Sequence, residues 1–475
     1  MTPSSSKPSA LPAGSAGRGA SAASLETTPR GHRPDAVWAE TLLTPDRRRE
    51  HVRLRVSDGR ITAVEEHAEP QAGDLRLGLV VPGFVNAHSH AFHRALRGRT
   101  HDAGGDFWRW RDAMYRVAET LTPASYRDLA RRVFLEMVQA GWTAVGEFHY
   151  VHHRPDGRPY DPPHAMELAL AEAAREVGIR LVLLDTCYLT ADVDGRPLEP
   201  EQRRFGDGDA DAWLARWSAL RDAIGDDPLV AVGAAIHSVR AVPLPAIERI
   251  VAGIPHDVPL HLHVAEQPRE TAAFLAMHGE TPVAALDRLG VLAPRTTLVH
   301  GTHLSPRDVD LVGAAGATVV FCPTTEADLG DGIGPARVLA DAGARIAVGS
   351  DGQSVIDPLL ELRGLEAGER LSSGRRGRFT PAELLAVGAA HGARSLGLEA
   401  SVFAPGAPAD LVELDPDSVR TSGSAPEQLV LTATAADVRT TVVAGHPVFH
   451  GSGPIRRHAV PDASPRGVSG IEPDP

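Results

Sequence analysis

The sequence predicts an α/β protein, a (β/α)8 TIM-like barrel with a small β-sandwich domain built from the N- and C-terminal segments. Between residues 82 and 403, short apolar segments of strand type alternate with longer segments of helix type. Eight strand-type segments occur there, the repeat number of a closed parallel barrel. Short strand-like runs also occur in 35–81 and 404–452, and we expect these two segments to pair. An open doubly wound sheet is the alternative for the central part.

The chain begins with residues 1–34, which are rich in Ser, Ala, Gly and Pro and lack the apolar core of a signal peptide. We expect this segment to be a disordered N-terminal tail. Residues 51–57 then alternate between apolar and polar side chains, as a strand does. Asp58-Gly59 predicts a turn into a second strand at 60–64.

The first barrel strand is expected at the apolar run that follows the break at Pro82-Gly83 and ends in His88-Ser89-His90. Seven further strands are expected at 143–148, 180–184, 229–236, 259–264, 297–300, 318–321 and 345–351. Helices are expected at 123–140, 164–177, 209–224, 269–278 and 306–315.

Strand-like segments return near the C-terminus, at 410–414, 428–433, 438–443 and 447–449. The last residues, 453–475, are rich in Pro, Ser and Gly, and we expect a flexible tail. The predicted domains are therefore a barrel over 82–403 and a composite small β domain over 35–81 and 404–452, with a tail at each end.

Composition excludes several classes of function. The chain has 475 residues, of which 43% are hydrophobic and 23% charged, as in an ordinary soluble protein. Its net charge of -13 argues against a nucleic-acid or anionic membrane partner, and no apolar run is long enough to span a membrane. The two cysteines, Cys187 and Cys322, give no disulfide framework and favour the reducing cytoplasm.

Histidines and acids stand at the ends of several predicted strands, and strand C-termini converge on one face of a barrel. His88 and His90 are two residues apart, so both point to the same side of an extended strand. Three imidazoles and a carboxylate suit zinc and leave one position for water. The residues at these strand ends are His88, His90, His261, His263, Glu266, His300 and Asp351.

Each of these residues also has an ordinary structural explanation. Asp351 follows Gly349-Ser350 and could cap a helix, while Glu266 could be solvated. Chance alone is a poor explanation for such residues at several strand ends, so their joint occurrence favours a mononuclear metal site. The only lysine, Lys7, lies in the predicted tail, so a carboxylated lysine cannot bridge two metals inside the barrel, although a glutamate bridge stays open.

The strand-end motifs resemble those of the deaminase branch of the amidohydrolase superfamily. They are His88-Ser-His, His263-Val-Ala-Glu, His300 of the sixth strand and Ser350-Asp351. The resemblance covers most of residues 35–450. More specific motifs resemble the formimidoylglutamate deiminases, which hydrolyse N-formimidoyl-L-glutamate to N-formyl-L-glutamate and ammonia in histidine degradation. These motifs are Asn86-Ala-His-Ser-His-Ala-Phe, Phe107-Trp-Arg-Trp-Arg, Glu147-Phe-His-Tyr-Val-His-His, His237-Ser-Val-Arg, Cys322-Pro-Thr-Thr-Glu-Ala and Glu361-Leu-Arg-Gly-Leu-Glu-Ala-Gly.

This resemblance implies a role for each matching residue. His88, His90, His263 and Asp351 would hold one Zn2+ per chain, and Glu266 and His300 would be the acid-base and polarising residues. Asp351 is an alternative acceptor for the proton of water. The substrate-binding residues would be Arg111, Tyr150, His237 and Arg240. His93 departs from the family pattern, which has Gln there. A homodimer is also expected.

The residues themselves favour a small-molecule substrate with two carboxylates, because arginine binds carboxylates in a bidentate manner. Arg111 and Arg240 follow the first and fourth predicted strands, at loop positions where a barrel keeps its specificity groups. Both could instead be surface charges, and Tyr150 could be core packing. Rival functions are deamination of guanine, cytosine or an adenosine derivative, which needs a flat aromatic slot, and a non-catalytic metal-binding protein, which has no need of Glu266.

Overall fold

The computed structural model describes residues 34–100 and 107–451. The two predicted tails lie outside these residues, apart from Pro34. Within the described part, no helix is both long enough and apolar enough to cross a membrane. Cys187 and Cys322 are both buried and free.

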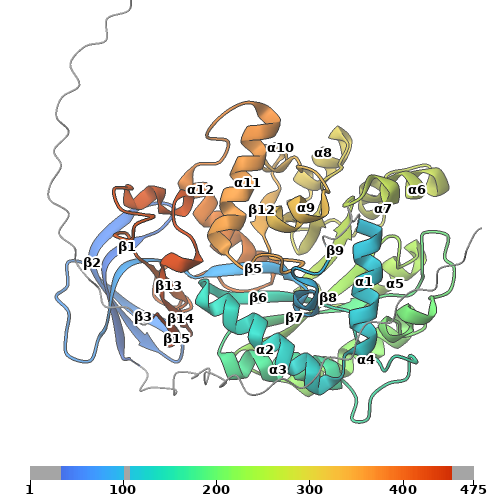
Figure 1. Ribbon diagram of the computed structural model, residues 1–475, viewed down its shortest axis with the longest axis horizontal. Coiled ribbons are helices and arrows are strands. Elements are labelled where there is room, and N and C mark those ends of the chain that lie inside the picture. Colours follow the sequence, from blue (N-terminus) through green and yellow to red (C-terminus); the bar gives the residue numbers. More distant parts are fainter. Residues whose placement is uncertain (1–33, 101–106, 452–475) are drawn as a thin grey trace, which may run out of the picture.

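Eight parallel strands form the wall of a barrel, with helices packed around it (Figure 1). They are hydrogen-bonded in the order β12-β11-β10-β9-β8-β7-β6-β5, and a parallel bridge between Ser89 and Asp351 joins the first strand to the last. The predicted fold class is confirmed. The strands are β5 (Phe84–Ser89), β6 (Trp142–His149), β7 (Arg180–Cys187), β8 (Val230–Ser238), β9 (Leu260–Val264), β10 (Thr296–His300), β11 (Thr318–Phe321) and β12 (Arg345–Val348).

Several helices begin at a residue whose side chain caps them, namely α2, α4, α7, α8, α11 and α12. Thr122 caps α2 in a reciprocal pair with Ser125, and Pro123 occupies the first helical position, where its missing N–H costs nothing. Five helices match the predicted ranges: α2 (Pro123–Gln139), α3 (Ala165–Val177), α4 (Ala210–Ile224), α6 (Pro268–His278) and α8 (Pro306–Ala314). Others were not predicted: α1 (Phe107–Thr120), α5 (Leu244–Gly253), α7 (Pro282–Arg288), α9 (Pro323–Leu329), α10 (Ala336–Ala342), α11 (Pro358–Ser373), α12 (Pro381–Ala386) and α13 (Gly392–Ser395).

The two ends of the described chain share a second sheet, with strand order β15-β14-β13-β4-β1-β2-β3. Strand β4 pairs in parallel with β1 and antiparallel with β13, and it leads directly into barrel strand β5. The sheet therefore fixes the start of the barrel wall. Its strands are β1 (Ala36–Leu43), β2 (Arg48–Ser57), β3 (Arg60–Glu65), β4 (Leu75–Pro82), β13 (Leu411–Leu414), β14 (Val438–Val443) and β15 (His446–His450).

One predicted strand of this region is wrong. Residues 428–433 were expected to be extended, but most of them belong to a 3-10 helix, η4 (Pro426–Leu431). Pro426 stands at its first position, and Leu429 and Val430 are buried. A short apolar run buries its side chains equally well as a strand or as a helical turn, so its pattern does not distinguish them.

Candidate active site

The predicted metal ligands meet at the C-terminal mouth of the barrel. His88 and His90, at the end of β5, both direct Nε2 at Oδ1 of Asp351, at 3.3 and 3.4 Å. His263 of β9 brings its Nε2 to 3.2 Å from that of His88. Ser89 points the other way and donates a hydrogen bond to Glu147. We call His88, His90, His263, His300 and Asp351 the mouth cluster.

Backbone contacts set which ring nitrogen faces the centre of this cluster. His90 Nδ1 lies 2.8 Å from the carbonyl oxygen of Phe148, and His263 Nδ1 lies 2.9 Å from that of His237. An Nδ1–H that donates to a carbonyl leaves the Nε2 lone pair directed inward, the arrangement found around metal-ligating histidines.

The charges of the cluster also suit a dication. Burial lowers the pKa of His88, His90 and His263, so these imidazoles are neutral. Burial by itself would raise the pKa of Asp351, but its contacts with His88 and the nearby His300 outweigh this and lower the pKa, so the carboxylate is ionised. Three neutral imidazoles and one carboxylate, with their lone pairs convergent, form a donor set that fits zinc.

Glu266 and His300 lie beside these ligands without joining the predicted set. His300 Nε2 is 3.8 Å from Glu266 Oε1, and its Nδ1 is 3.4 Å from Glu326 Oε1. Burial raises the pKa of Glu266 to about 8. Burial opposes the charge of His300, but Glu266 and Glu326 outweigh it and raise its pKa to about 10.

The backbone is strained at the same place. Ala265, His300 and Asp351 all have positive φ angles, of 53°, 70° and 36°. Residues other than glycine adopt this left-handed conformation at a cost, and strain of this kind gathers at functional sites. Here it follows the ends of strands β9, β10 and β12.

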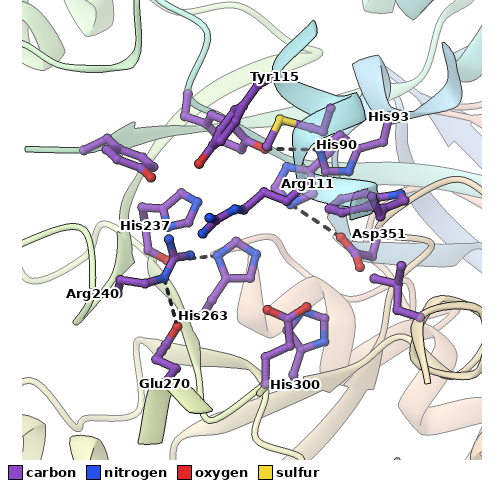
Figure 2. Close-up of a pocket in the computed structure, with 16 residues that line it drawn as sticks. His90, His93, Arg111, Tyr115, His237, Arg240, His263, Glu270, His300 and Asp351 are labelled. Carbon is purple, nitrogen blue, oxygen red and sulfur yellow. Dashed lines mark hydrogen bonds and ion pairs between the residues drawn. The ribbon is translucent and has the colours of Figure 1, made fainter. Parts of the chain in front are cut away.

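A pocket opens above the mouth cluster (Figure 2). His88 is fully buried beneath it, and of the strand-end candidates His261 lies outside the lining, where its Nε2 is 2.7 Å from the carbonyl oxygen of Ser395. Every other predicted site residue lines the pocket. Arg240 occupies a loop as predicted, but Arg111 lies on helix α1 rather than in a loop. The lining residues are His90, His93, Trp110, Arg111, Met114, Tyr115, Tyr150, Tyr188, His237, Arg240, His263, Glu266, Glu270, His300, Leu329 and Asp351.

A profile of the amidohydrolase family matches residues 79–448. The chain belongs to the amidohydrolase family. It is a hydrolase that acts on C–N bonds, in a family whose members are typically metal-dependent. Its structure is similar to that of an amidohydrolase from Brucella melitensis, with a TM-score of 0.82 and 32% identity over 88% of this chain and 95% of that one. It is also similar to an adenosine deaminase from Xanthomonas campestris with bound zinc, with a TM-score of 0.74 and 25% identity over 87% and 92%.

Two relatives in Pseudomonas aeruginosa represent different substrates. The chain is 38% identical to a formimidoylglutamate deiminase, over 80% of this chain and 86% of the relative. It is 33% identical to an 8-oxoguanine deaminase, over 82% and 88%. The family is therefore settled by sequence similarity, whereas the substrate has to be argued from the pocket.

Several pocket residues of this amidohydrolase were not predicted. Tyr115 follows Arg111 by four residues on α1, and the Arg111 guanidinium lies 5.7 Å from its ring centre. Glu270 also follows Glu266 by four residues, but Glu266 precedes helix α6, so this spacing does not place the two side chains on one helix face. Tyr188 carried no signal of its own. Trp110 stands within the motif Phe107-Trp-Arg-Trp-Arg, but no role was assigned to it. Glu326 likewise belongs to the motif Cys322-Pro-Thr-Thr-Glu-Ala, and it contacts His300 without lining the pocket.

A second group of histidines and acids lies on the other side of the barrel wall. Strand alternation turns Phe148 towards the mouth cluster, where its ring centre is 4.4 Å from that of His263, and turns the next residue, His149, away. His152 Nδ1 lies 2.7 Å from Glu167 Oε1, and Arg216 Nη1 lies 2.8 Å from Asp185 Oδ1. We call His149, His152, Glu167, Asp185 and Arg216 the outer cluster.

Proposed function

We propose that this amidohydrolase converts N-formimidoyl-L-glutamate and water to N-formyl-L-glutamate and ammonia, as a step of histidine degradation. One observation carries the proposal: Arg111 and Arg240 both line the pocket above the mouth cluster. Two guanidinium groups suit a substrate with two carboxylates. The 38% identity to a formimidoylglutamate deiminase supports the same substrate.

His88, His90, His263 and Asp351 would hold one zinc ion, which when bound acidifies a water molecule and so supplies the nucleophile. Asp351 or Glu266 accepts the proton that this water loses. His300 donates a hydrogen bond to the charge that develops on the attacking oxygen, in keeping with its raised pKa. The departing nitrogen needs two protons, and both come from the attacking water. Glu266 delivers them in turn, the C–N bond breaks and ammonia leaves, while the attacking oxygen becomes the formyl carbonyl.

The remaining pocket residues hold the substrate. Arg111 and Arg240 would each bind one carboxylate, and Tyr150 and His237 would contact the same molecule. His93 Nε2 lies 3.1 Å from the Tyr150 hydroxyl, so in this chain His93 positions that hydroxyl. We further propose that the enzyme acts in the cytoplasm as a homodimer, which sedimentation of the purified protein would test.

A purine-type substrate is the second candidate, because Trp110, Tyr115 and Tyr188 also line the pocket and one relative is an 8-oxoguanine deaminase. A neutral base, however, carries no negative charge to match two guanidinium groups, whereas a dicarboxylate carries two. A non-catalytic role is less well supported, since it gives no reason for Glu266 to lie 3.8 Å from His300 of the mouth cluster.

The test is ammonia release by purified, zinc-loaded protein. N-formimidoyl-L-glutamate, 8-oxoguanine and 5-methylthioadenosine are compared by kcat/KM, with the Glu266→Gln variant as the background control. The proposal expects N-formimidoyl-L-glutamate to exceed the other two by several powers of ten. A higher kcat/KM on either purine would reject the substrate but keep the deaminase chemistry, and no turnover of any of the three would reject both.

A further inference from the structure

A buried ion pair with open hydrogen-bonding positions lies at the edge of the active-site pocket. Arg240 Nε lies 3.3 Å from Glu270 Oε2, and Figure 2 shows the two side chains facing each other beside His263. Arg240 follows β8, and Glu270 stands in the first turn of α6. Their side chains are only 11% and 9% exposed, and both line the pocket.

The pair does not satisfy itself. Within the described protein, Arg240 Nη1 and Glu270 Oε1 are buried and have no hydrogen-bond partner. A buried donor or acceptor without a partner is costly, and charged groups more so. Because the two open atoms belong to side chains already in contact, one small ligand can satisfy both of them.

The chemistry of these two atoms restricts that ligand. Arg240 Nη1 needs an acceptor such as a carboxylate, whereas Glu270 Oε1 is itself an acceptor and needs an N–H. A ligand that has a carboxylate but no N–H would be attracted by the Arg240 guanidinium and repelled by the Glu270 carboxylate. A ligand with an N–H on the carbon next to its carboxylate satisfies both atoms.

We infer that Glu270 is a specificity-determining residue, which holds Arg240 through Nε and selects N-substituted α-amino acids over plain carboxylates. The inference rests on the proposed function, because the substituted nitrogen of N-formimidoyl-L-glutamate is bonded to the carbon that carries its α-carboxylate. Glu270 adds a preference for an N–H beside the carboxylate, which the two arginines do not supply. Arg240 and Glu270 together would therefore bind this end of the substrate, leaving Arg111 for the other carboxylate.

The experiment measures binding of two dicarboxylates to the zinc-loaded protein by calorimetry. N-formyl-L-glutamate carries the N–H, and glutarate does not. In Glu270→Gln, an amide oxygen still accepts from Arg240 Nε, but the negative charge is lost. We expect N-formyl-L-glutamate to bind about tenfold to a hundredfold more weakly, the range for a hydrogen bond to a charged group. Glutarate should bind as tightly as to wild type or more tightly, because a repulsive charge is removed.

Two further variants separate selection from a merely structural role. Glu270→Ala also removes the partner that holds Arg240 in place, so both N-formyl-L-glutamate and glutarate should bind more weakly. Glu270→Gln should then restore the binding of glutarate, which is a rescue by the conservative variant. Glu280→Gln is the matched control, since Glu280 pairs with Arg288 outside the pocket lining. It should change neither affinity.

The outcomes distinguish this inference from the proposed function. If Glu270→Gln shifts both ligands by the same factor, or leaves N-formyl-L-glutamate unchanged, Glu270 does not select the N–H, and the proposed function stands. If the wild type binds neither dicarboxylate, the proposed substrate is wrong and the inference falls with it.

Discussion

The mouth cluster and the outer cluster both combine buried histidines with buried carboxylates, and they lie on opposite faces of strand β6. Their distances differ in kind. In the mouth cluster, two imidazole nitrogens, the Nε2 atoms of His88 and His263, approach each other at 3.2 Å, and both histidines of β5 converge on one oxygen of Asp351. In the outer cluster, His152 forms ordinary contacts to two acceptors, Glu167 Oε1 at 2.7 Å and the carbonyl oxygen of Thr186 at 2.8 Å.

The charges explain this difference. Burial leaves His88, His90 and His263 neutral, so the lone pairs of these three imidazoles face a point to which none of them supplies a cation. The outer cluster contains Arg216, and the pKa of His152 is raised: burial and Arg216 oppose its charge, but Asp185 and Glu167 outweigh them. A histidine that donates from both ring nitrogens is an imidazolium and cannot ligate a metal. Histidines and carboxylates thus form a candidate metal centre where lone pairs converge, and an ion network where a cation, Arg216, is built in.

The largest expected effect separates the two clusters by metal content. His88→Ala and Asp351→Ala should each lose zinc and activity together, because each removes a ligand. His152→Gln should keep the one zinc ion of the wild type, since its ring serves the ion network. Elemental analysis of the purified variants measures this. A second zinc ion in the wild type that disappears in His152→Gln would show that the comparison is wrong.

Removing the proton carrier should affect turnover without affecting metal. Glu266→Gln should retain zinc and lower kcat by roughly two to four powers of ten, the range for an acid-base group. Steady-state kinetics and elemental analysis on the same sample test it. Turnover near the wild-type value would remove Glu266 from the mechanism.

Breaking the outer cluster should act on stability instead. Arg216→Met leaves Glu167 and Asp185 buried without their arginine, and breaking a buried ion pair costs about 3–5 kcal/mol. Urea unfolding of the zinc-loaded protein measures the loss. Arg288→Met is the control, because its pair with Glu280 is more exposed and should contribute far less to stability. Equal losses in both variants would contradict the network.

The two pocket arginines should have an intermediate effect, confined to substrate binding. Arg111→Met or Arg240→Met should lower kcat/KM for N-formimidoyl-L-glutamate by roughly tenfold to more than a hundredfold, as for a charge-assisted hydrogen bond. Zinc content should stay the same. An analogue with one carboxylate replaced by an amide should be rejected by the wild type, and far less by the variant that lost the matching arginine. Unchanged rejection in both variants would show that neither arginine reads a carboxylate.

The smallest effect concerns pH and again marks the outer cluster. The pKa of His152 is higher in the folded protein than the ordinary value of about 6.5. Its contribution to stability is therefore complete below that value and is lost as pH rises through the folded pKa. The wild type should lose stability across this interval relative to His152→Gln. Parallel stability curves for the two proteins would mean that His152 is neutral.

The gathering of histidines and acids at the barrel mouth could be predicted from sequence because it depends on a geometric rule. Parallel strand ends converge, so the strand-end residues could be grouped before their positions were known. The choice of His88, His90, His263 and Asp351 as metal ligands came from the family resemblance. Glu270 and Tyr115 could not be grouped in this way, because they stand on helices whose rotation about their axes depends on tertiary packing. His149 and His152 were noticed only as part of a motif. To separate them from the mouth cluster, one must know which face of β6 each side chain occupies and where Arg216 lies. No local sequence pattern contains this information.

The small sheet also constrains the order in which the chain can fold. Strand β4 is bordered on one side by β13, and the amide of Gly78 donates to the carboxylate of Glu413, 335 residues later in the chain. During synthesis, β1 to β4 emerge first and must wait for nearly the whole barrel before this edge is covered. Closing so long a loop is slow, and an unpaired edge strand invites association with other chains. Proteins of this design should therefore depend on chaperones most during the interval between completing β4 and releasing β13 from the ribosome.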